Sequence, residues 1–221
     1  LRNLTLRNGL GRNTDDSPAN GGAIYNYLAA LVLENVTVEN NRVTKDSSEG
    51  GSGGAVVVQG GPATITGSSF ENNAATQWGG AIFVIGNANL TIEHTTFRNN
   101  RLASTSEIGD FGGGAIHVQA GSQAVIRNSF FEENSTEGAK DGGALDLGGA
   151  GDVIGSQFLR NSAGRRAGAI LVRPTSDHLR VHGSLFLGNR ALGTDNGGGA
   201  IRSTRIGASD GADVVINSCA S

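Results

Sequence analysis

One two-part motif recurs along the chain and constrains its fold more than any other feature. The first half is Gly-Gly-Ala followed by alternating aliphatic residues. The second half reads Ile/Val/Leu-x-x-Ser/Thr-x-Phe-x-x-Asn. Spacing within each half is nearly invariant, whereas the segments between the halves differ in length. A repeat of about thirty residues with these properties is typical of a solenoid, in which each repeat forms one coil stacked on the next.

Short strands are the elements that this repeat predicts. Apolar residues alternate with other residues after each Gly-Gly-Ala and again before each Ser/Thr, which indicates half-buried strands of about four residues. The Phe begins a third short element, so we expect three strands per coil, joined by glycine-rich corners. The sequence therefore predicts an all-β, single-stranded parallel β-helix over residues 1–221. Repeat positions from Leu1 to Val215 correspond to about seven coils.

Two columns of like residues should stabilise the stack, because equivalent positions of successive coils lie about 4.8 Å apart. Buried phenylalanine rings should stack in one column, which contains Phe70, Phe97, Phe131, Phe158 and Phe186. Asparagine amides should hydrogen-bond from coil to coil in the other, which contains Asn41, Asn73, Asn100, Asn134, Asn161 and Asn189. We expect both columns to be structural.

Composition excludes several classes of partner and cofactor. The formal net charge is −3 and no basic cluster is present, so we expect no nucleic-acid partner. No apolar stretch is long enough to span a membrane. The single cysteine, Cys219, precludes an internal disulfide and should face outward. We expect no cofactor and no metal, although His178 and His182 would share one face of a strand, which leaves a metal pair as an alternative.

One column of outward-facing residues could alternatively form a catalytic site. The second residue after each Gly-Gly-Ala should point away from the core, and His117 and Asp146 occupy this position on neighbouring coils, with Arg173 nearby. Such a cluster could supply the base, the orienting group and the anion clamp of a polysaccharide lyase or glycoside hydrolase. Scattered solvated side chains would give the same pattern, and no set of convergent carboxylates accompanies it. We therefore expect no enzyme here.

The same outward positions carry apolar side chains in the first coils: Tyr25, Tyr27, Val57, Phe83 and Ile85. Contiguous exposed apolar residues usually mark a covered surface. The cover could be a loop of the same chain, within residues 11–20, 42–52 or 101–112, then a protein partner, then a glycan. These five residues are our partner-binding candidates.

Both ends of the chain fall at the same phase of the repeat, and no capping segment is evident. An uncapped solenoid exposes an apolar cross-section and unpaired strand edges. Two explanations remain open. The chain is a segment of a larger solenoid, or its subunits stack end to end into a filament.

A family resemblance adds to this picture. Gly79-Gly80-Ala81-Ile82 together with Phe97-Arg98-Asn99-Asn100 resembles the repeats of chlamydial-type polymorphic outer-membrane proteins. More broadly, the chain is similar to right-handed parallel β-helix proteins, which include autotransporter passengers and pectate-lyase-like enzymes. The resemblance covers nearly the whole chain and implies right-handed coiling and secretion or surface display. It also implies an adhesive role toward a host or cell-surface protein or glycan.

The motif is imperfect in two places. Ala167-Gly168-Ala169 lacks the first glycine, and Leu6 and Gly9 replace the Phe and the Asn in the first coil.

Overall fold

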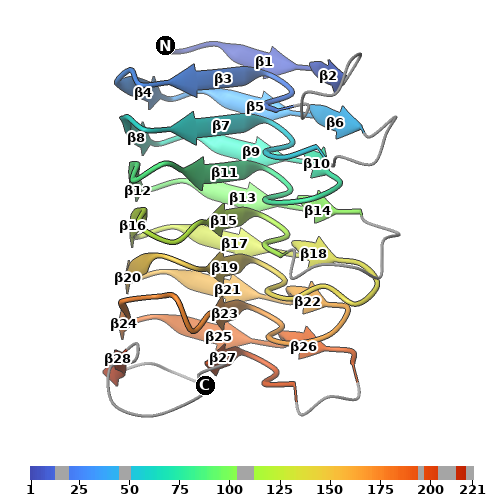
Figure 1. Cartoon of the computed structure of the whole chain (residues 1–221), viewed down its shortest axis with the longest axis vertical. Helices are drawn as coiled ribbons and strands as arrows, with labels where there is room; N and C mark the ends of the chain where they lie inside the picture. Colours follow the sequence, from blue (N-terminus) through green and yellow to red (C-terminus); the bar gives the residue numbers. More distant parts are fainter. Residues whose placement is uncertain (13–19, 45–50, 104–111, 194–196, 204–212, 218–221) are drawn as a thin grey trace.

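In a computed structural model of the chain, the described residues are 1–12, 20–44, 51–103, 112–193 and 197–203, together with the backbone of 213–217. They form a right-handed parallel β-helix with four sheets of seven strands each (Figure 1). All strand pairs join successive coils in parallel register, and the described residues contain no helix.

We number the sheets in the order in which the chain enters them after Gly-Gly-Ala. The first sheet comprises β3 (Ile24–Tyr27), β7 (Val56–Gln59), β11 (Ile82–Ile85), β15 (Ile116–Val118), β19 (Leu145–Leu147), β23 (Ile170–Val172) and β27 (Ile201–Ser203). The second comprises β4 (Leu31–Glu34), β8 (Pro62–Thr66), β12 (Asn89–Glu93), β16 (Gln123–Arg127), β20 (Ala150–Ile154), β24 (His178–His182) and β28 (Asp213–Asn217).

The other two sheets are built from shorter strands. The third comprises β1 (Thr5–Arg7), β5 (Thr37–Glu39), β9 (Ser69–Glu71), β13 (Thr96–Arg98), β17 (Phe130–Glu132), β21 (Gln157–Leu159) and β25 (Leu185–Leu187). The fourth comprises β2 (Leu10–Arg12), β6 (Arg42–Thr44), β10 (Ala74–Ala75), β14 (Arg101–Leu102), β18 (Ser135–Thr136), β22 (Ser162–Ala163) and β26 (Arg190–Ala191).

The fourth sheet corrects the expectation of three strands per coil. Its strands follow the Asn of each repeat and are only two or three residues long, too short to show an alternating pattern. Six coils, from β3 to β26, contain all four strands, and β1–β2 and β27–β28 add partial coils at the two ends. The expected β-solenoid fold is therefore confirmed, but it has six complete coils where the sequence predicted about seven.

The phenylalanine column is confirmed. Successive ring centroids from Phe70 to Phe186 are 4.7–4.9 Å apart, and neighbouring rings are inclined by 3–11°. Four of the five side chains are completely buried, and only Phe186 is half-buried. Each buried Phe contributes about 1.5–3 kcal/mol to folding by removing apolar surface from water.

The asparagine column is also confirmed, as a continuous hydrogen-bond ladder. In each step, Nδ2 of one Asn donates to Oδ1 of the next, for example from Asn100 to Asn134 at 3.0 Å. Nδ2 of Asn134 also donates to the Phe97 carbonyl at 2.9 Å, and its Oδ1 accepts from the Asn100 backbone N–H at 3.0 Å. The ladder thereby satisfies buried backbone groups at the corner between the third and fourth sheets.

A second ladder runs through the Ser/Thr positions of the repeat, to which the sequence analysis assigned no role. The hydroxyl of Ser129 accepts the backbone N–H of Thr95 at 3.2 Å and donates to the Arg127 carbonyl at 2.7 Å. The same pattern recurs at Ser68, Thr95, Ser156 and Ser184. A short hydroxyl therefore closes the corner between the second and third sheets in each of these coils.

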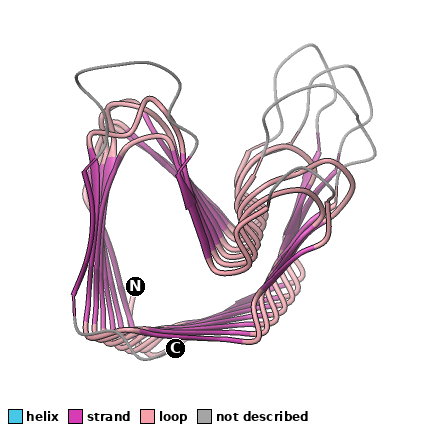
Figure 2. Ribbon diagram, turned by 90° about the horizontal axis from the view of Figure 1, so that it is seen from below, coloured by secondary structure: helices cyan, strands magenta, loops and turns pink. Residues whose placement is uncertain are grey.

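An inward bend shapes the cross-section of each coil. Seen along the axis, the segment returning from the fourth sheet meets the first sheet at this bend (Figure 2). Here the chain approaches the neighbouring coil closely, because a Cβ atom added to Gly80 would lie 2.0 Å from the Gly114 carbonyl oxygen. We call the residues just before each Gly-Gly pair the return segment. It faces the outer side of the first sheet.

Candidate functional site

The outer column of the first sheet is mostly buried, which corrects the expectation that it faces solvent. Val57, Phe83, His117 and Asp146 are only 1%, 4%, 5% and 0% exposed, respectively. Alternation along a strand had correctly placed these side chains on the side away from the main core. It could not reveal that the return segment covers them.

The cover at the centre of this column is Trp78, the only tryptophan of the chain. Its ring stacks on Phe83 at 5.3 Å between centroids and lies 6.0 Å from the ring of His117. One coil further, Gly112 lies directly against Asp146, because a Cβ atom at this glycine would be 2.0 Å from Oδ2. The chain itself therefore closes this face, through residues 78 and 112. Most of loops 11–20 and 101–112, and part of 42–52, lie outside the described residues.

The structure brings the three catalytic candidates together. Arg173 donates to both carboxylate oxygens of Asp146, from Nε at 2.7 Å and from Nη2 at 2.6 Å. Nδ1 of His117 lies 3.2 Å from Oδ2 of Asp146, although without the geometry of a hydrogen bond. Burial by itself raises the pKa of Asp146, but Arg173 and then His117 lower it more strongly, so this pKa lies below the ordinary value.

A second buried carboxylate lies on the return segment and was missed by the sequence analysis. Asp141 is completely buried and accepts hydrogen bonds from both Arg165 and Arg166, whose Nε atoms lie 2.9 and 3.1 Å from Oδ1. Burial by itself raises the pKa of Asp141, but the two arginines together lower it by a larger amount, so this pKa lies below its usual value. The sequence did contain a signal for this cluster, because Asp141 directly precedes a Gly-Gly pair and the adjacent arginines Arg165 and Arg166 follow one coil later.

The partner-binding candidates divide into exposed and buried side chains. Tyr25 and Tyr27 are 50% and 57% exposed, their rings are 6.4 Å apart, and Tyr25 donates to Oε1 of Gln59 at 2.6 Å. Ile85 is half-buried. Val57 and Phe83, as described above, are not available to a partner. Leu28, which is 64% exposed, extends the apolar surface beside the tyrosines.

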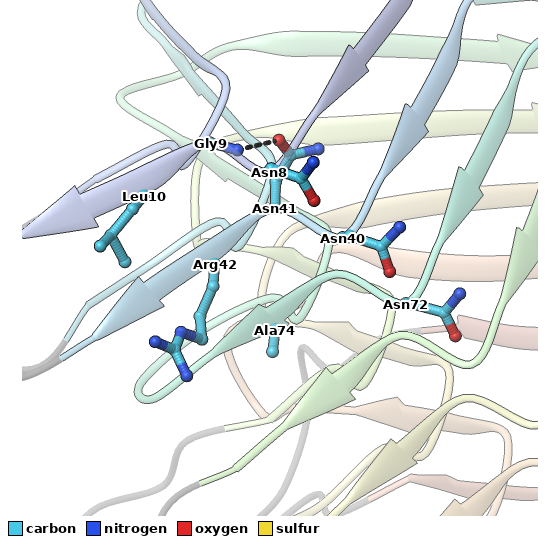
Figure 3. Close-up of a pocket in the computed structure, with 8 residues that line it drawn as sticks. All are labelled: Asn8, Gly9, Leu10, Asn40, Asn41, Arg42, Asn72 and Ala74. Atoms are coloured by element: carbon cyan, nitrogen blue, oxygen red, sulfur yellow. Dashed lines mark hydrogen bonds between the residues drawn. The ribbon is translucent and has the colours of Figure 1, made fainter.

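A shallow groove of about 400 Å³ lies at the corner between the third and fourth sheets (Figure 3). Asn8, Asn40 and Asn72 project from it in a row, and each has a left-handed backbone, with φ of 59°, 56° and 54°. Arg42 and Leu10 line it as well. These asparagines precede the ladder position by one residue, and the sequence analysis overlooked them.

The remaining candidates form no binding site in the described part of the chain. Nε2 of His178 lies 3.4 Å from Oδ1 of Asp152 and 3.0 Å from Nη1 of Arg180, whereas His182 is exposed. No group of three or more potential metal ligands occurs among the described residues. None of the described residues form a helix that is long and apolar enough to cross a membrane. Cys219 lies outside the described residues.

Comparison with known proteins identifies the architecture and leaves the activity open. A family model described as "Right handed beta helix region" matches residues 32–220, most of the chain. No curated protein matches the chain. No solved structure matches it either.

Proposed function

Because the chain belongs to the right-handed β-helix family, we propose that it is a structural or adhesive rod of the extracellular space or the cell surface. Its coils hold exposed side chains and loops at fixed spacing along one axis. A partner that contacts several coils at once gains affinity from each contact. The resemblance of its repeats to surface-displayed β-helix proteins supports this location.

The closed outer face of the first sheet is the observation that carries this proposal. A general base has to reach within about 3 Å of the proton that it removes. Asp146 has no exposed side-chain surface, and Arg173 occupies both of its oxygens. These contacts suit a clamp that joins two coils better than a group that acts on a sugar.

The adhesive part of the proposal concerns the exposed aromatic residues of the first coil. Tyr25 and Tyr27 are each at least half exposed, and an aromatic ring that carries a hydroxyl group suits contacts with a protein or a glycan. End-to-end stacking of subunits into a filament is a separate part of the proposal. Regular coil spacing supports it, because one coil offers its neighbour the same hydrogen-bonding pattern throughout the stack.

Adhesion of beads coated with the purified chain tests the role. We expect retention on cells and on immobilised surface proteins or glycans, and a loss of about tenfold in the Tyr25→Ser/Tyr27→Ser variant, because both contacts are removed. The matched control is Thr64→Ser/Thr91→Ser on the second sheet, which should adhere like the parent. Equal adhesion of the tyrosine variant would refute the assignment of these residues.

An activity assay separates the rod from the enzyme alternative. We expect no product from a panel of acidic and neutral polysaccharides. Cleavage that disappears in Asp146→Asn and in His117→Gln, with the circular dichroism of both variants intact, would overturn the proposal. Light scattering and negative-stain images over a concentration series test assembly, and a strict monomer at every concentration would exclude the filament.

A further inference from the structure

The row of exposed amides described above has unused hydrogen-bonding capacity. The side chains of Asn8, Asn40 and Asn72 are exposed, and none of them forms a hydrogen bond within the described part of the chain. Their left-handed backbone is shared, so the three amides leave the corner in the same direction (Figure 3). Each amide can donate and accept at once.

The surroundings of the row favour a neutral ligand. Arg42 is exposed and has no ion pair among the described residues. Arg7, Glu39 and Glu71 immediately precede the three asparagines, on the outer side of the third sheet, so positive and negative groups both accompany the row. Leu10, which is 43% exposed, adds an apolar surface at one end.

Spacing sets a further condition on the ligand. The amides repeat once per coil, at about 4.8 Å. A linear ligand whose successive units each contact the amide of one coil must run along the axis of the β-helix. Each of its units must also advance by nearly the distance between coils. An extended, linear, β-1,4-linked glycan meets this condition, since each of its sugars advances by a closely similar length and presents neighbouring hydroxyl groups.

We propose that this groove binds a neutral, extended, linear glycan, with about one sugar facing each coil. The amides of Asn8, Asn40 and Asn72 exchange hydrogen bonds with sugar hydroxyls, and Leu10 packs against the apolar face of a terminal sugar. This site deepens the adhesive role proposed above and lies on a different face from His117 and Asp146. The two proposals can fail separately. If the chain adheres only through Tyr25 and Tyr27, the adhesive role stands, but the glycan-binding test given below fails.

The row has a definite end, which limits the length of the ligand. Asn99 continues it by one coil, with φ of 53° and an exposed side chain. The next two positions are Glu133 and Arg160, which form an ion pair at 3.1 Å. Four amides in succession therefore face the ligand, which corresponds to a segment of about four sugars at one sugar per coil.

Two oligosaccharides of the same sugar test the spacing argument. Cellohexaose is extended, whereas maltohexaose contains the same glucose units in a curved, helical chain. We expect the purified chain to bind cellohexaose, measured by calorimetry or by NMR titration, at least tenfold more tightly than maltohexaose. Equal affinities, or no binding of cellohexaose, would overturn the proposal.

Glycine variants test the residues, because glycine retains the left-handed backbone while removing the amide. We expect Asn40→Gly/Asn72→Gly to weaken cellohexaose binding by about tenfold, since two amides that hydrogen-bond to the glycan are lost. The matched control is Asn35→Gly/Asn128→Gly, two exposed left-handed asparagines at the corner between the second and third sheets. Equal loss in both variants would contradict the site.

Discussion

At the scale of single residues, asparagine serves two separate roles in the same corner. The ladder residue, such as Asn134, is completely buried and satisfies two backbone groups of the preceding coil. The residue before it, such as Asn40 or Asn72, has a left-handed backbone and an exposed side chain. Asparagine tolerates this backbone better than most residues. Each Asn-Asn pair therefore combines an exposed amide with a buried amide that stabilises the fold.

Replacement of a central ladder residue should be costly. In Asn134→Ala, the Phe97 carbonyl and the Asn100 backbone N–H both lose a buried partner. We expect the free energy of unfolding to fall by about 2–6 kcal/mol, at 1–3 kcal/mol for each of the two unsatisfied groups. Urea denaturation followed by circular dichroism measures this change. Asn189→Ala, at a half-buried position of the same ladder, should cost much less, and equal losses would contradict the role of burial.

At the scale of the element, the turn before the first sheet shows how backbone conformation selects residues. The first glycine of the Gly-Gly pair has positive φ in five coils, from Gly21 to Gly142. Ala167 occupies the same position with φ of 60° and is completely buried. A Cβ atom in this conformation is strained. The departure from the motif at this position is therefore tolerated at a cost in stability.

A reciprocal pair of substitutions tests this cost. Ala167→Gly should raise the free energy of unfolding by about 1 kcal/mol, because it removes the strain of a left-handed alanine. Gly142→Ala should lower it by more than that, since the new Cβ atom would lie 2.3 Å from the Leu145 carbonyl oxygen. Thermal unfolding of both variants measures the two effects. A less stable Ala167→Gly variant would show that the alanine methyl packs well enough to offset the strain.

At the scale of the whole molecule, buried ion pairs tie the return segments and the first sheet of successive coils together. Asp141 and Asp146 both have pKa values below the ordinary value of 3.8, because arginines overcome the effect of burial. In the unfolded chain, these carboxylates regain ordinary pKa values. Their contribution to stability is therefore complete above about pH 4 and is lost as the pH falls through the lower, folded pKa values.

Acid should consequently destabilise the protein more than its exposed ion pairs would suggest. We expect the urea midpoint to fall between pH 4 and pH 2, and Asp146→Asn to reduce this dependence while lowering stability at pH 7 by about 3–5 kcal/mol. The control is Glu34→Gln, which removes an exposed pair with Arg2 and should cost less than about 1 kcal/mol. An unchanged pH profile in Asp146→Asn would refute this account.

The sequence predicted the parts of the molecule that follow from spacing alone. Columns such as Phe97 over Phe131, or Asn100 over Asn134, depend only on a constant interval within the repeat, so they were predictable. Contacts made by segments of variable length were not. Trp78 and Asp141 lie on the return segment, whose position relative to the first sheet is set by the bend of the coil and not by alternation.

The asparagine ladder also gives the molecule an electrical direction. One Nδ2–H of each ladder asparagine from Asn41 to Asn161 donates to the Oδ1 atom of the asparagine in the coil that follows, so five amide–amide hydrogen bonds point the same way. Aligned dipoles lying side by side repel, whereas opposed ones attract. Two such molecules in lateral contact would therefore gain electrostatically by running in opposite directions, and a lattice of them would alternate in polarity.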